Sequence, residues 1–187
     1  MNKFRASYTV LNMWSSGNWE EAVKYYFKLE QFTSRAMADG KDFHDSWEKH
    51  IKETSTLPEV FGGAKLVNPQ TELKLVVQMD EWLELVGKID CLEAPTIHEF
   101  KTGKSSSESY ASSWQIGVYG VLCAMSGIKI DRGIVHHFDQ YKKTYDWSQV
   151  WITKDVIKDS AEWIVTHASE MHSYLVENNL YERFGKK

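Results

Sequence analysis

The stretch that determines how this chain folds is residues 71–102, TELKLVVQMDEWLELVGKIDCLEAPTIHEFKT. Three of its runs are rich in Leu, Val and Ile and are typical of β-strands: residues 72–79, 81–92 and 96–102. Only three residues separate the last two runs, so the pattern predicts a β-hairpin. Because alternate side chains of a strand share a face, we expect Glu99 and Lys101 to point the same way. A suitable hairpin register then places Asp90 beside Glu99.

These three side chains have the chemistry of a phosphodiester-cleaving site. Two neighbouring carboxylates, Asp90 and Glu99, are oxygen ligands for a hard cation such as Mg²⁺ or Mn²⁺. The ammonium group of Lys101 can position an attacking water and stabilise charge that develops on a phosphate. The alternative is an exposed hairpin face, where such an ion pair stabilises the fold by at most about 1 kcal/mol. The three residues alone leave both interpretations open.

Further motifs precede and follow the hairpin. In chain order the set is Gly40-x-x-x-His44, Gly87-x-x-Asp90, Glu99-x-Lys101-Thr102-Gly103-Lys104 and Gln115-x-x-x-Tyr119. This order resembles the RecB-like branch of the PD-(D/E)XK nucleases, which includes nuclease domains of bacterial recombination helicases, CRISPR-adaptation exonucleases and phage exonucleases. The resemblance covers about residues 40–119.

The resemblance implies a role for each matching residue. The metal ligands would be the side chains of His44, Asp90 and Glu99 together with the backbone carbonyl of Phe100. Catalysis would rest on Lys101 with the same two carboxylates. Substrate or the metal's water shell would be held by three further residues, Gln115, Tyr119 and Lys104. Without the resemblance, these positions would be ordinary: His44, Gln115 and Tyr119 as helix residues and Lys104 as a solvated lysine in a turn.

The cysteines narrow the assignment within that branch. Some members bind an iron–sulfur cluster through four cysteines, whereas this chain has only Cys91 and Cys123. An intramolecular four-thiolate cluster is therefore excluded. We expect both cysteines to be small buried hydrophobic residues, with Cys91 on the face opposite Asp90. A reducing, cytoplasmic location fits them better than a disulfide does.

Length, hydropathy and net charge limit the membrane and nucleic-acid partners that this chain could have. No apolar run approaches the length of a membrane span, and the 187 residues suffice for one domain. A net charge of −4 argues mildly against nucleic-acid binding, but bound divalent ions would reverse the local sign. A basic stripe could still hold DNA, with weak, salt-sensitive binding helped by a homo-oligomer or a partner protein. Its candidate members are Arg5, Arg35, Lys101, Lys104, Lys142 and Lys143.

The pattern elsewhere predicts helices and two further strands. Helices are expected on either side of residues 15–17 and at residues 32–52, 112–125 and 155–178, strands at 132–141 and 145–152, and loops at 54–70 and 105–109. The end of the chain is expected to fray. On the second-last strand, His136 and His137 are expected to face opposite ways, one half-buried and one exposed.

This order predicts an α/β fold with a restriction-endonuclease-like αβββαβ core, in which a mixed central sheet is flanked by helices. We expect one nuclease domain over residues 1–187. Its parts would be a helical N-terminal region (1–53) that carries His44, the catalytic sheet and helix (71–152) and a C-terminal helix (155–178).

The function predicted from these observations is a metal-dependent deoxyribonuclease, with exonuclease action on DNA ends or single strands favoured. Two alternatives stay open: a non-catalytic nucleic-acid-binding or assembly subunit on the same fold, and an unrelated α/β binding protein in which the motif arose by chance.

Overall fold

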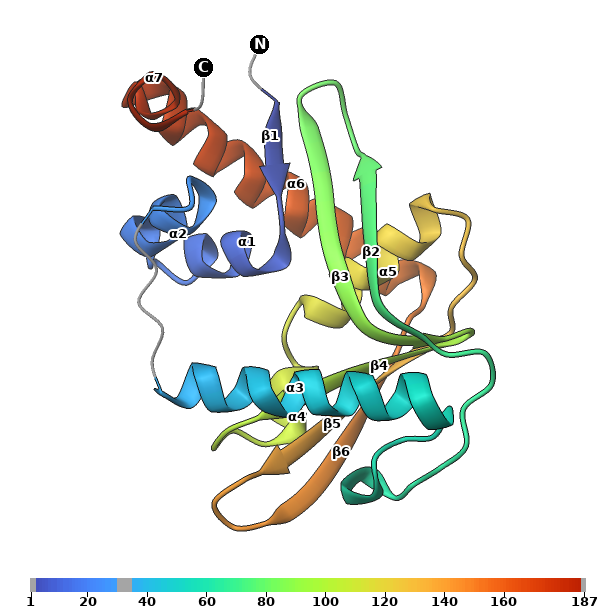
Figure 1. The fold of residues 1–187 in the computed structure, drawn as a ribbon. Coiled ribbons are helices and arrows are strands. Elements are labelled where there is room, and N and C mark those ends of the chain that lie inside the picture. Colours follow the sequence, from blue (N-terminus) through green and yellow to red (C-terminus); the bar gives the residue numbers. More distant parts are fainter. Residues whose placement is uncertain (1–2, 30–34, 186–187) are drawn as a thin grey trace.

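The computed structural model describes residues 3–29 and 35–185, except for the side chains of 35–39 (Figure 1). Its elements are β1 (Phe4–Ala6), α1 (Tyr8–Ser15), α2 (Trp19–Tyr26), α3 (Arg35–Thr54), the 3₁₀ turn η1 (Glu59–Phe61), β2 (Gln70–Gln78), β3 (Leu83–Glu93), β4 (Thr96–Thr102), α4 (Ser107–Ala111), α5 (Gln115–Met125), β5 (Arg132–Asp139), β6 (Thr144–Trp151), α6 (Lys154–Glu177) and α7 (Leu180–Phe184). The predicted α/β class is therefore confirmed.

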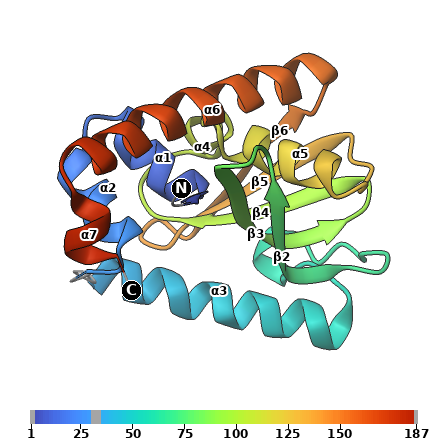
Figure 2. The ribbon, with the colours of Figure 1, turned by 90° about the horizontal axis from the view of Figure 1, so that it is seen from above.

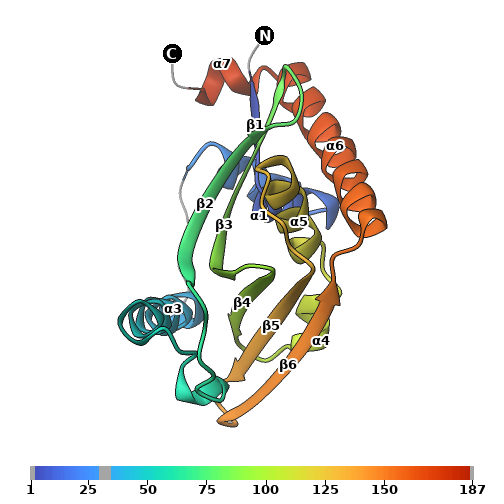
Figure 3. The same ribbon diagram turned by 90° about the vertical axis from the view of Figure 1, so that its right-hand side faces the viewer.

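The strands form one mixed sheet of six strands in the order β1-β3-β4-β5-β6, with β2 paired to β3. The β1–β3 and β4–β5 pairs are parallel, and the other pairs are antiparallel. The predicted hairpin is β3–β4, in which Glu93 lies opposite Thr96 and Cys91 opposite His98. Beyond that last pair the β2–β3 ribbon diverges from β4, β5 and β6 (Figure 3). The register, if continued by one residue, would place Asp90 opposite Glu99.

Helices cover both faces of the sheet. Helices α1, α5 and α6 lie on one face and α3 lies on the other (Figure 2). The larger apolar cluster joins the first group to the sheet, and α5 is apolar on nearly every side because it is buried between β3 and α6. A second cluster, which contains Trp47, Phe61, Cys91 and Phe100, holds α3 against the opposite face. Cys123 lies in the first cluster, so the two free cysteines are buried apart.

Several local predictions need correction. The expected loop at 105–109 contains the start of α4, because the hydroxyl of Ser106 accepts a hydrogen bond from the Ser109 amide and caps a short helix. The C-terminal tail forms α7, whose Tyr181 and Phe184 pack on Phe27 at ring distances of 5.9 and 5.6 Å. The expected loop at 54–70 contains η1 and one isolated β-bridge, and its last residue, Gln70, begins β2. The predicted helix start at 32 lies outside the described residues.

His136 and His137 face opposite ways as predicted, but their predicted exposure is wrong, because both are buried, with 3% of each exposed. Strand β5 lies between β4 and β6, and both of its faces are covered. On one face His136 stacks on Phe100 and donates to or accepts from His98 and Tyr145 at 2.9 and 3.0 Å. On the other, His137 contacts residues near α4. An interior strand therefore buries side chains on both faces.

Among the residues that the structure describes, no helix combines the length and the apolar character that crossing a membrane requires.

Gly87 sets how closely α5 approaches β3. A Cβ atom at this position would lie 2.4 Å from the Cδ1 atom of Leu122 and 3.4 Å from the ring of Tyr119. Leu122 is fully buried and has little room to move. The glycine is therefore required by packing, since the absence of a side chain lets the helix sit directly on the strand.

We predict that Gly87→Ala lowers the free energy of unfolding by about 1–3 kcal/mol, because the added methyl group overpacks the α5–β3 contact. Urea denaturation of the parent and the variant measures this. In a Leu122→Ala background, which makes room for the methyl group, the same change is expected to be much less destabilising. An equal loss of stability in both backgrounds would contradict the close-approach explanation.

Candidate active site

The two carboxylates predicted for the site come from adjacent strands and lie largely out of water. The Asp90 side chain on β3 is 13% exposed, and its Oδ2 atom accepts a hydrogen bond from the Phe100 amide at 2.9 Å. Glu99 on β4 is 2% exposed. A buried carboxylate is unfavourable unless it is paired, hydrogen-bonded or bound to a metal, so the partners of Glu99 are informative.

One oxygen of Glu99 is well satisfied and the other is not. Its Oε1 atom lies 2.6 Å from Nζ of Lys101 and accepts a hydrogen bond, also at 2.6 Å, from the Gln115 amide. Its Oε2 atom is buried and has no hydrogen-bond partner among the described residues. An unpaired buried carboxylate oxygen is destabilising by about 1–3 kcal/mol or more. It is also a ready ligand for a cation.

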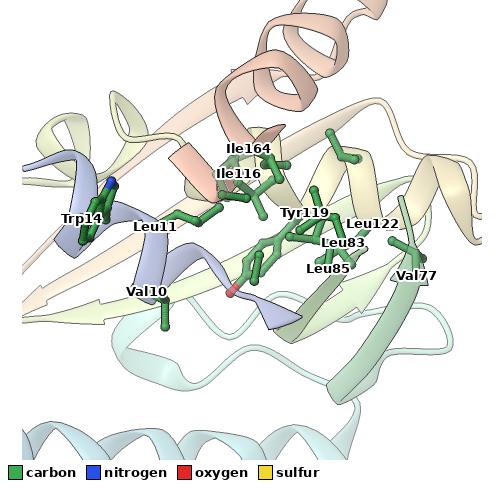
Figure 4. Packing of buried hydrophobic residues seen from close by; sticks show 14 of the residues in the cluster. Val10, Leu11, Trp14, Val77, Leu83, Leu85, Ile116, Tyr119, Leu122 and Ile164 are labelled. Carbon is green, nitrogen blue, oxygen red and sulfur yellow. The ribbon is translucent and has the colours of Figure 1, made fainter. Parts of the chain in front are cut away.

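Helix α5 is attached to the site through Gln115 and Tyr119, which lie one turn apart. The Gln115 amide also donates to the Tyr119 hydroxyl at 2.9 Å, and that hydroxyl donates to the Lys88 carbonyl at 2.9 Å. The Tyr119 ring lies among Leu83, Leu85 and Leu122 with its hydroxyl directed away from them (Figure 4). Through this chain of contacts, the helix holds the Glu99 carboxylate in place and ties itself to β3.

Helix α3 brings His44 to the same region from the opposite face of the sheet. Its Nδ1 atom lies 3.7 Å from Oδ2 of Asp90. Trp47, one turn further along α3, packs on Phe61 and Phe100 and so holds the helix against the sheet. Burial lowers the pKa of His44, which favours the neutral imidazole. Neutral imidazole is the form of histidine that binds metals.

The charges of the site perturb one another. Burial raises the pKa of Asp90 well above its usual value, and the negative charge of Glu99 raises it further. Burial alone would lower the pKa of Lys101, but Glu99 and Asp90 outweigh that effect and leave the pKa raised. Lys101 is therefore a stable ammonium ion beside two carboxylates that repel each other.

Solved structures of other proteins share this architecture. No family model and no curated protein matches the sequence. An alkaline exonuclease from Laribacter hongkongensis superposes with a TM-score of 0.60 at 10% identity, over 96% of this chain and 93% of that one. A protein from Eubacterium rectale assigned as an exonuclease superposes with a TM-score of 0.65 at 13% identity, over 95% and 83%.

The chain has the fold of these exonucleases. At such low identity the likeness concerns the fold alone, and it confirms the predicted mixed sheet flanked by helices. A further structure, of the protein SSO0001, has a TM-score of 0.57 at 13% identity and covers 93% of this chain and 78% of that one.

Within this exonuclease fold, the structure brings most of the predicted site residues together. Asp90, Glu99, Lys101, Gln115 and Tyr119 are linked by the contacts above, and Phe100 joins them through its amide. No three His, Cys, Asp or Glu side chains in the described part of the chain form a preassembled metal-binding group. His44, Asp90 and Glu99 therefore have suitable donor types without yet surrounding one point.

Lys104 lies apart from this group. It is exposed, and its Nζ atom lies 5.7 Å from the centre of the Tyr141 ring. Gly103 before it, just after the end of β4, has a φ of 126°, a conformation that glycine adopts more readily than other residues. The structure thus gives Lys104 no contact with the carboxylates.

Sequence reasoning missed two tyrosines that surround Lys101. The Lys101 ammonium lies 5.7 Å from the centre of the Tyr110 ring, and the Tyr110 hydroxyl donates to the Thr102 carbonyl at 3.4 Å. Tyr8, at the start of α1, is near enough to affect the pKa of Lys101. Neither tyrosine has a spacing signal, because each reaches the site only through folding of α1 or α4 onto the sheet.

The electrostatics predict that Asp90→Asn stabilises the metal-free protein. The pKa of Asp90 is raised on folding, so the folded state favours the protonated carboxyl group. The free energy of unfolding is therefore highest below the unfolded pKa of about 3.9 and falls as the pH rises toward the folded pKa. Asparagine cannot ionise and its side-chain carbonyl can still accept from the Phe100 amide. The variant is expected to be more stable at pH 7 by about 1 kcal/mol or more, and closer to the parent at pH 4.

Urea denaturation in EDTA at both pH values measures this difference. Asp159→Asn, at an exposed position on α6, is the matched control and is expected to show no comparable gain. An Asp90→Asn variant that is no more stable than the parent at pH 7 would show that the two carboxylates do not oppose folding.

Proposed function

We propose that this protein is a metal-dependent deoxyribonuclease of the RecB-like branch of the PD-(D/E)XK nucleases, formed as one domain by residues 1–187. The observation that carries the proposal is the buried Glu99 carboxylate, whose Oε2 atom has no partner among the described residues while Oε1 holds Lys101. With Asp90 beside it, the site has a cation-binding oxygen and a fixed ammonium group on the same strand face. An ordinary hairpin surface has neither, because its charges are solvated.

The residues present fit a hard divalent cation, Mg²⁺ or Mn²⁺. Carboxylate oxygens of Asp90 and Glu99 would hold it, with the imidazole of His44 and the backbone carbonyl of Phe100 as further ligands. Such an ion, when bound, supplies positive charge against the phosphate and acidifies a coordinated water. Burial and the charge of Glu99 raise the pKa of Asp90, and a bound cation would offset both effects.

The protein's own groups position the other participants. Lys101, held by Glu99 at 2.6 Å, can orient the attacking water and offset negative charge as phosphorus becomes five-coordinate. Gln115 keeps the Glu99 carboxylate in one orientation, and Tyr119 fixes Gln115 by a hydrogen bond. Because these supporting groups lie on the buried helix α5, they need no rearrangement during the reaction.

Exonuclease action on DNA ends or single strands is the mode we favour. The proteins with a similar fold include exonucleases. The Laribacter hongkongensis enzyme was also solved in complex with dAMP, and that structure superposes with a TM-score of 0.56 at 11% identity, over 95% of this chain and 92% of that one. We infer that the present chain likewise acts on DNA, in a reducing, cytoplasmic compartment.

The test is cleavage of linear and circular DNA of one sequence, single- and double-stranded, in Mg²⁺ or Mn²⁺. We expect loss of linear DNA only, and no cleavage in EDTA. Lys101→Ala is expected to lower the rate by about 10²–10³-fold, the effect of removing one group that stabilises developing charge. Asp90→Asn is expected to be inactive.

Lys129→Ala, which removes an exposed lysine in the loop after α5, is the matched control and is expected to keep full activity. Cleavage that persists in both Lys101→Ala and Asp90→Asn would rule out the proposed site. DNA binding without cleavage by the parent protein under every condition would favour the non-catalytic subunit instead.

A further inference from the structure

A basic and aromatic pocket includes a residue of β3, the strand that carries Asp90. It has a volume of about 500 Å³ and is bounded by β1, the start of α1, the end of α2, β3 and α7. Helices α2 and α7 lie together beside β1, at the end of the molecule where both termini emerge (Figures 1 and 2). Its lining includes Lys3, Arg5 and Lys28, and none of its lining residues is acidic.

The strand register connects this pocket to the site. Val86 lines the pocket and lies four residues before Asp90 on β3. At a strand rise of about 3.3 Å per residue, they are about 13 Å apart along β3. Arg5 is opposite Glu84 of β3, and Ser7 of the pocket is the N-cap of α1.

The cations of the pocket are placed on its rim with their charges outward. Arg5 is held by Glu84 at 2.8 Å, with 53% of its side chain exposed, and Lys3 donates to Gln78 at 3.1 Å. Lys28 is exposed just after α2. The neighbouring strand residues Phe4 and Ala6 are fully buried, so β1 presents only its charged face to the pocket. Such a rim favours a polyanion.

Aromatic rings form the rest of the wall. Phe27 makes an edge contact with Tyr181 and a tilted contact with Phe184, both on α7, and Tyr26 is stacked on Phe4 at 4.9 Å. Tyr25 differs from these, because it lines the pocket and is 38% exposed, without a stacking partner among the described residues. The exposed Tyr25 ring, in a pocket whose other rings pack on one another, is a platform on which a planar base can stack.

We propose that this pocket binds a segment of single-stranded DNA, with phosphates on Lys3, Arg5 and Lys28 and a base stacked on Tyr25, and that it leads the strand along β3 to the candidate site. The inference rests on the proposed nuclease function and specifies its substrate as an unpaired strand. Cations beside one exposed aromatic ring suit unpaired DNA, whose bases are free to stack, whereas a duplex keeps its bases stacked on one another. An acidic peptide would use the cations but leave the ring unused.

The experiment measures binding without cleavage. A fluorescein-labelled 12-mer of thymidylate is titrated with the full chain in EDTA, and anisotropy is followed at several KCl concentrations. Tyr25→Ala is expected to weaken binding at least about five-fold, as loss of one stacked base does, and Tyr25→Phe is expected to restore it. Lys28→Ala and Arg5→Ala are each expected to reduce the slope of log affinity against log salt by about 0.7.

Lys129→Ala is the matched charge control, with an unchanged slope expected. The proposal is overturned if Tyr25→Ala and Lys28→Ala bind the oligonucleotide as the parent does. It is also overturned if a duplex of equal length binds as tightly, or if a polyglutamate peptide competes as well as unlabelled oligonucleotide.

A second measurement separates this inference from the proposed function. Hydrolysis of bis(p-nitrophenyl) phosphate by the parent in Mn²⁺ tests the candidate site with an ester that has no strand to bind. If the parent cleaves neither this ester nor DNA while Tyr25→Ala still weakens oligonucleotide binding, the nuclease proposal fails and the binding pocket stands. If the ester is cleaved and the pocket variants bind like the parent, only the pocket fails.

Discussion

Burial of the Glu99 carboxylate beside Asp90 is the constraint on which the rest of this structure depends. Two like charges in a region of low dielectric repel each other, and burial raises the pKa of Asp90 accordingly. Lys101 and Gln115 compensate one oxygen of Glu99, while the other has no partner among the described residues. A fold selected for stability alone would place apolar residues here. The arrangement is therefore typical of a site that binds a cation.

The elements around this pair are arranged to keep it in place. Gly87 lets α5 lie directly on β3, and this close approach allows the Tyr119 hydroxyl to reach the Lys88 carbonyl and Gln115 to reach Glu99. On the other face, the cluster around Trp47 holds α3 so that His44 approaches Asp90. Two apolar clusters on opposite faces of one sheet thus position polar groups where the β3–β4 hairpin opens.

Local pattern was sufficient for the elements nearest the site. Alternation within 81–102 predicted both strands, the hairpin and the shared face of Glu99 and Lys101, because period-two patterning depends only on the backbone. The same reasoning failed at His136 and His137, since whether a strand face is exposed depends on what packs over it. The assignment of Lys104 to substrate binding stays a prediction, since this lysine is exposed near the Tyr141 ring.

The sequence by itself determined the order of the longer helices and of strands β2 to β6, the α/β class and the residue types of the candidate site, because these follow from periodicity and from spacing along the chain. Only the tertiary structure decided which groups meet. Three features depend on packing between segments far apart in sequence. They are the burial that leaves Oε2 of Glu99 without a partner among the described residues, the tyrosines near Lys101, and the pocket between β1, α2 and α7. Such contacts leave no periodic signal, since they arise when separately formed elements pack to bury their apolar faces.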